Sequence, residues 1–178
     1  MVALAVVASL QFPNRDKPLV RPKGEERKMS VAVWKEKRTL LIAVIGFSFI
    51  MAEISAGTWV PIALTVSGFS GSAAAFAFGV FWIVITIGRV LGGFVVEAIG
   101  RFRTVLISTL VTAAGILVFM LGEVIALPFL GLVLWGLGMS MGFPMAVTAM
   151  SDDPRKAPFR INMIITVVYI SSISVGPA

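Results

Sequence analysis

The sequence predicts an all-α protein, a polytopic bundle of helices that cross a membrane. Apolar residues make up 58% of the 178 residues and charged residues only 13%, and the mean hydropathy is +0.98. These values lie far from those of a water-soluble domain. In addition, several apolar stretches reach the roughly 20 residues that a helix needs to cross a hydrocarbon core. Water-soluble enzymes and nucleic-acid-binding proteins therefore fit the sequence poorly.

The chain contains no cysteine and no histidine. This excludes disulfides, thiolate or imidazole metal sites, and every catalytic triad that depends on either residue type. The formal net charge of +6 does not indicate nucleic-acid binding, because the basic residues lie between the apolar stretches, where they orient a membrane protein. We expect no enzymatic activity, no metal, no cofactor and no nucleic-acid partner.

The chain opens with an apolar run over residues 1–12, which we interpret as a truncated transmembrane helix. A signal peptide is the alternative, but no basic residue precedes the run and no clear cleavage site of small residues follows it. Residues 13–38 form a polar linker that is rich in proline at first and more helix-like later. Its nine basic and four acidic residues leave a balance of +5, which predicts a cytoplasmic location.

Apolar segments fill residues 39–178, which we expect to form the transmembrane bundle. The predicted spans cover residues 39–66, 73–96, 104–121, 125–150 and 161–178. The last of them stops short of a full crossing, so the chain has about four full spans and, with residues 1–12, two truncated ones. The first span contains Glu53, has Trp59 where aromatic residues favour the membrane interface, and is broken near its far end by Pro61; the second contains Arg89.

Basic residues are confined to alternate connections of this bundle. Of the 15 Lys and Arg residues, nine lie in the linker, two in the turn after the second span, three in the loop after the fourth span, and one, Arg89, inside a span. The other connections have none. Positive charge marks the cytoplasmic side, so we expect these three segments inside the cell and the bundle in a bacterial cytoplasmic (inner) membrane.

Glu53 is an ionisable residue inside an apolar span, and such residues are costly. It lies about fourteen residues, or roughly 20 Å, from the predicted inner surface. Burial disfavours the charge of an unpaired carboxylate, so Glu53 can exchange a proton as a transporter's coupling site does. The other role that fits is a polar contact that holds two helices together.

Arg89 lies roughly 12 Å from the cytoplasmic end of its helix, about 9 Å away in depth from Glu53. An ion pair would require both side chains to extend. Glu97 is too far along the same helix for a direct pair. The sequence therefore favours another interhelical or backbone contact for Arg89 over either ion pair.

Glycines four residues apart suggest close helix packing. Gly88 and Gly92, like Gly138 and Gly142, lie on one side of a helix, where missing side chains let a neighbour approach. Pro144 frees a carbonyl in mid-helix and bends the axis, as is common beside cavities or moving gates. Two roles are open for Trp59, Trp82, Trp135 and Tyr169. They can contact substrate, or they can anchor the helices at the interface or pack in the core, which is commoner for each.

The turn after the second span resembles the loop signature of the major facilitator superfamily, G-x-x-x-D-[RK]-x-G-[RK]-[RK]. The matching positions are Gly93, Glu97, Gly100 and Arg101, with Arg103 just beyond, and a Gly-Arg-x-x-Gly lead-in at Gly88, Arg89 and Gly92. Glu97 stands for the usual Asp, whereas Ala98 and Phe102 stand where the family has basic residues. Residues 136–154 resemble the glycine-rich tenth helix of bacterial members, residues 51–64 the seventh, and residues 169–178 the eleventh.

The resemblance implies half of a major facilitator fold, from the end of helix six to part of helix eleven. It implies secondary active transport of a small solute by alternating access, with proton coupling as one option, in a lipid bilayer and together with a missing N-terminal half. The first and fourth spans would line the cavity, which makes Glu53, Trp59 and Phe143 the candidates for substrate or proton binding. The turn motif, from Arg89 to Arg103, would act at the cytoplasmic gate.

Two other classes of protein compete with a transporter. A non-transporting membrane protein, such as an assembly partner or a sensor, would use the bundle only to anchor the basic linker. An oligomeric channel would carry polar residues along one helix face, and no predicted span does. The substrate, the direction and the coupling ion cannot be inferred from the sequence, because these architectures carry many solutes.

Overall fold

The computed structural model of the chain describes residues 23–122 and 126–175, which form helices and short connections without a strand. The helices are α2 (Lys23–Lys35), α3 (Lys37–Val66), α4 (Gly71–Ile99), α5 (Arg101–Met120), α6 (Ala126–Met150) and α7 (Ala157–Val175). The described residues leave out the expected helix at residues 1–12, the first part of the linker (13–22), residues 123–125 between the third and fourth spans, and residues 176–178 of the last span.

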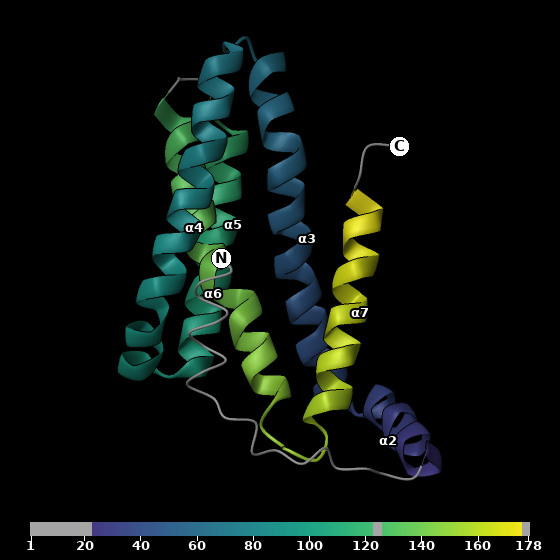
Figure 1. Cartoon of the computed structure of the whole chain (residues 1–178). Coiled ribbons are helices and arrows are strands. Elements are labelled where there is room, and N and C mark those ends of the chain that lie inside the picture. Colours follow the sequence, from purple (N-terminus) through teal and green to yellow (C-terminus); the bar gives the residue numbers. More distant parts are fainter. Residues whose placement is uncertain (1–22, 123–125, 176–178) are drawn as a thin grey trace, which may run out of the picture.

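The helices α3 to α7 run side by side as a bundle, and α2 lies at one end of it, beside the ends of α3 and α7 (Figure 1). All five bundle helices are long and apolar enough to cross a membrane. The expected all-α polytopic bundle is therefore confirmed. Because α2, the α4–α5 turn and the α6–α7 loop lie at the same end in Figure 1, we call this the charged end: residues 23–38, 99–103 and 151–160.

Several helices begin a few residues before the predicted spans. Polar residues were excluded from those spans, but a helix can continue past the apolar layer into water. The helix α4 starts at Gly71, where the Ser70 side chain caps it by accepting a hydrogen bond from the backbone N–H of Ala73 at 3.2 Å. The start of α5 at Arg101 places both arginines of the turn motif in its first turn.

The helix α3 continues through Pro61 to Val66, so the break expected there is wrong. A proline removes one backbone hydrogen bond, and this loss near the end of a 30-residue helix does not terminate it. The helix α6 likewise continues through Pro144.

The centre of the bundle is α6, which contacts α3, α4, α5 and α7. More than half of its most apolar stretch is buried, against less than a third in each of the other spans. Its closest approach is to α5, where Gly115, Gly131 and Gly138 have no room for a side chain because backbone of the facing helix lies against them.

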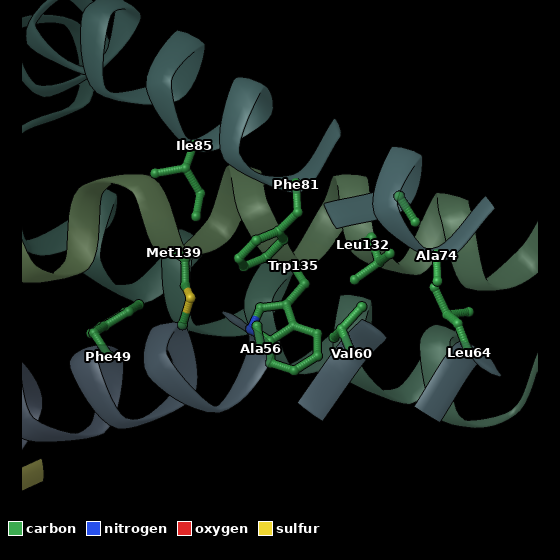
Figure 2. Close-up of a cluster of buried hydrophobic side chains, with 11 residues drawn as sticks. Phe49, Ala56, Val60, Leu64, Ala74, Phe81, Ile85, Leu132, Trp135 and Met139 are labelled. Atoms are coloured by element: carbon green, nitrogen blue, oxygen red, sulfur yellow. The ribbon is translucent and has the colours of Figure 1, made fainter. Parts of the chain in front are cut away.

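Two buried apolar clusters fill the spaces around α6. The larger one joins α3, α4 and α6 and is centred on Trp135, whose ring lies 5.9 Å from that of Phe81 (Figure 2). The Phe119 ring of α5 lies 6.0 Å from that of Trp135. The smaller one lies toward the charged end and joins α2, α3, α6 and α7; it consists of Val33, Ala43, Ala146, Met150, Met163 and Ile164. The helix α2 is thus attached to the bundle through Val33.

Candidate functional site

An ion pair joins the middle of α3 to α4. The Nη2 of Arg89 donates hydrogen bonds to both carboxylate oxygens of Glu53, each at 2.8 Å. The Glu53 side chain is 10% exposed and that of Arg89 is 40% exposed. The pair therefore combines a buried carboxylate with a guanidinium that is partly exposed at the surface of the bundle.

This pair corrects the expectation from sequence, which disfavoured it on the depth difference of about 9 Å. The physical reason lies in the opposite directions of the two helices. Because side chains tilt toward the N-terminus of their helix, Glu53 tilts toward the charged end and Arg89 tilts away from it. Both tilts shorten the gap, and the long arginine side chain covers the rest.

An aromatic residue, Trp82, lies on the same face of α4 as Arg89. The two are seven residues apart, which is two helical turns and about 10 Å along the axis. Its ring approaches Gly57 of α3 closely enough that a side chain at Gly57 would lie 3.7 Å from it, and it is 37% exposed. Trp82 is not among the substrate candidates expected from sequence, although its spacing of seven from Arg89 is a signal that could have found it.

The other two predicted substrate candidates, Trp59 and Phe143, have different surroundings from Glu53. Trp59 is 49% exposed, and Phe143 packs against the smaller cluster. Among the described residues, no hydrogen bond, ion pair or ring contact joins either of them to Glu53. The structure therefore pairs Glu53 with Arg89 and leaves Trp59 and Phe143 apart.

The turn motif spans the end of α4 and the start of α5. A single residue, Gly100, connects the two helices with a φ of +81°, a conformation that side chains disfavour. Gly93 has open space around it. Glu97 and Arg103 are exposed and form no ion pair with any described residue, whereas Arg101 donates to Asp152 at 3.0 Å.

Asp152 in the α6–α7 loop connects three parts of the charged end. It accepts hydrogen bonds from Arg101 and, at 2.6 Å, from Arg38 at the start of α3. These two hydrogen bonds, that of Arg38 first, lower the pKa of Asp152 from its usual value. All three side chains are more than a third exposed.

A second charge cluster surrounds Glu36, the residue that precedes α3. Its carboxylate accepts hydrogen bonds from Lys156, from Arg160 at 2.6 Å and from the Thr39 hydroxyl at 2.8 Å. Arg160 is only 7% exposed. The hydrogen bond from Lys156, followed by those from Arg160 and Thr39, lowers the pKa of Glu36 to about 2.

The paired glycines lie where helices meet. Gly88 and Gly92 of α4 face Ser140 and Met141 of α6, which leave no space for a side chain at either position. On α6, Gly138 faces Thr112 of α5 and Gly142 faces the Phe49 ring of α3. The second pair therefore accommodates two different neighbours.

Comparisons with known proteins place the chain in a family. A family model described as Major Facilitator Superfamily matches residues 1–177. Over 180 residues the chain is 28% identical to an uncharacterized MFS-type transporter of Yersinia pestis, in an alignment that covers all of this chain and 47% of that protein. The chain thus spans about half the length of the curated relative it matches. No solved structure matches it.

Proposed function

The chain belongs to the major facilitator superfamily, and we propose that it is one half of a secondary transporter that carries a small solute across a membrane by alternating access. The observation that supports this most is the Glu53–Arg89 pair inside two apolar spans. Charges at such a depth are costly and are kept where they bind ions, protons or substrate.

The exposed side of Arg89 indicates where the solute pathway runs. A guanidinium that is 40% exposed is stable in a membrane only when it faces water or protein. The α3–α4 face that carries Arg89 and Trp82 is therefore the face that lines the cavity, and the other half of the transporter covers it. Trp82 supplies an aromatic surface beside the charged pair.

Glu53 is the proton-coupling residue in this proposal. Protonation of its carboxylate removes the charge that holds Arg89, so the contact between α3 and α4 weakens at that point. A proton bound on one side of the membrane then favours a different arrangement of the two helices, which is how a ligand shifts a conformational equilibrium. Trp59 and Phe143 remain candidates for contacts elsewhere along the pathway.

The charged end acts as the gate on the cytoplasmic side of a bacterial inner membrane. Its orientation follows from the concentration of Lys and Arg in its three segments. The Arg101–Asp152 bond and the turn motif that includes Glu97 close this side, and they separate when it opens. Because these side chains are exposed, the bond is weak enough to break in each cycle.

The test uses the full-length protein in proteoliposomes with an imposed pH gradient. A panel of sugars, nucleosides, cationic drugs and organic anions is screened for solute-dependent proton flux. We expect Glu53→Gln to abolish this flux while membrane insertion stays normal, and the matched control Glu25→Gln, an exposed acid on α2, to transport like the wild type. Unchanged coupling in Glu53→Gln would rule out the coupling role, and an absence of flux with every solute would favour a non-transporting anchor or sensor.

The gating role is tested separately once a solute is known. Arg101→Ala should slow turnover more than it weakens solute binding, because Arg101 is remote from Glu53 along the chain and contacts Asp152 instead. A loss of binding with normal turnover would contradict a gate.

A further inference from the structure

One face of α2 carries basic and apolar side chains together. Arg27, Val31 and Trp34 follow one another at spacings of four and three, so they lie on one side of the helix, flanked by Lys28 and Lys35. Val31 is 50% exposed and Trp34 is 43% exposed. The opposite side is held by Val33, which is 1% exposed in the smaller cluster. The orientation of the exposed face is therefore fixed by packing.

Two hollows follow each other along this face and differ in polarity. The first is lined by Gly24, Arg27, Lys28 and Val31, so it is basic. The second is a groove between α2, α3 and α7 whose lining is entirely apolar and includes Trp34, Val44, Phe47 and Ile170. Its volume is about 260 Å³. A hollow bordered by two basic side chains, next along the same helix face to an apolar groove, has the polarity of a molecule with an anionic head and a hydrocarbon tail.

The position of α2 matches the depth of lipid headgroups. The exposed apolar surface of α3 begins directly after the charged residues, with Leu40 and Leu41. Trp34 lies just before this boundary, where indole rings are enriched in membrane proteins. In Figure 1 the helix α2 lies at the edge of the bundle, beside the end of α7, and does not continue the direction of α3. A basic helix with an apolar side in this position lies in the membrane interface.

We propose that α2 and this groove bind an anionic phospholipid of the leaflet at the charged end. The phosphate contacts Arg27 and Lys28, and one acyl chain lies in the groove past Trp34. Charge complementarity selects the anionic head, since Lys and Arg near a membrane surface attract anionic lipids. A non-helical protein segment fits less well, because its backbone would find no hydrogen-bond partner in a groove without polar lining. Lipid binding at this place would tie the linker to the membrane surface.

The experiment measures phosphatidylglycerol binding to the full-length protein by native mass spectrometry, with phosphatidylcholine as the neutral lipid. We expect preferential binding of phosphatidylglycerol, and an affinity about fivefold lower in each of Arg27→Gln and Lys28→Gln, as expected for one basic residue near the surface. The matched control Arg103→Gln, an exposed arginine in the first turn of α5 that lines neither hollow, should change the affinity less than twofold. Trp34→Ala should also weaken binding, and Trp34→Phe should restore it in part.

A competition arm separates a lipid from a free phosphate. Glycerol phosphate, which has no acyl chain, should fail to displace phosphatidylglycerol, because the groove contributes to binding. Equal affinities for the two lipids would overturn the proposal. Unchanged phosphatidylglycerol binding in Arg27→Gln and Lys28→Gln would overturn it as well, and so would a crosslink showing that another protein segment fills the groove.

Discussion

Charged residues are paired in two regions of the molecule that differ in setting. Inside the spans, Glu53 has Arg89 as its partner, and the acid is 10% exposed. At the charged end, Glu36 has three partners and Asp152 has two, and the two acids are 24% and 36% exposed. The acid of the first region has a single partner residue, whereas the acids of the second have several.

This difference separates a buried pair from an exposed cluster whose contacts can break singly. Removing a partner from a buried pair leaves a charge without compensation. A cluster with several partners loses one hydrogen bond at a time, and exposed charges are compensated by water. The contrast supports the proposal of solute and proton chemistry at Glu53 and Arg89 and of a gate that opens and closes at the charged end.

The largest expected effect comes from breaking the pair within the spans. Arg89→Leu leaves the buried Glu53 carboxylate unpaired, and we expect a loss of about 3–5 kcal/mol in stability. The double variant Arg89→Leu/Glu53→Leu should recover most of it, because no charge is then left in the apolar layer. Thermal unfolding in detergent measures both. If Arg89→Leu were as stable as the wild type, the Glu53 carboxylate would not depend on Arg89 for compensation of its charge, which would contradict this prediction.

Arg160→Met tests the best-buried member of the charged end. The side chain is 7% exposed, but Glu36 retains Lys156 and Thr39 as partners. We therefore expect a smaller loss, about 1.5–3 kcal/mol, the range for a hydrogen bond to a charged group. A loss as large as that of Arg89→Leu in the same unfolding assay would remove the distinction between the two regions.

Acid should weaken the charged end through Glu36. Because folding lowers its pKa from 4.5 to about 2, its contribution is fully present above pH 4.5 and is lost as the pH falls from there toward about 2. The stability difference between the wild type and Glu36→Gln should shrink over this window. Asp152, whose pKa is also lowered, leaves a residual acid dependence in the variant. A constant difference in melting temperature across the window would contradict the assignment.

The smallest effect is expected for Arg38→Ala. Its side chain is 58% exposed and pairs with Asp152, which is 36% exposed. Such surface pairs contribute about 0–1 kcal/mol, and added salt should reduce even this. The same unfolding assay, with and without salt, measures the effect. A loss above that range would indicate that the exposed pairs behave as one cooperative network.

Sequence reasoning reached the fold class because hydropathy and run length determine which segments enter a bilayer. It also identified Glu53 and Arg89 as the charges to examine. It missed their pairing because depth was counted along each helix separately, without the opposite side-chain tilts of antiparallel neighbours. Trp82 is not among the candidates from sequence, because its spacing of seven from Arg89 is a weak signal and its contact with Gly57 depends on the packing of two helices. Which residues of α4 and α6 face each other depends on helix rotation, and nearly uniform apolar sequences carry little information about rotation.

The connection at Gly100 limits how the bundle can deform. One residue spans less than 4 Å, so α5 can pivot about the end of α4 but cannot slide along it. On its other side α5 is fitted against α6 at Gly115 and Gly131, where backbone meets backbone. If the charged end of α4 moves, α5 is therefore expected to move with it, and α6 with α5. The three helices would therefore move together, with rotation possible only at Gly100. Arg89 lies on α4 and would move with it.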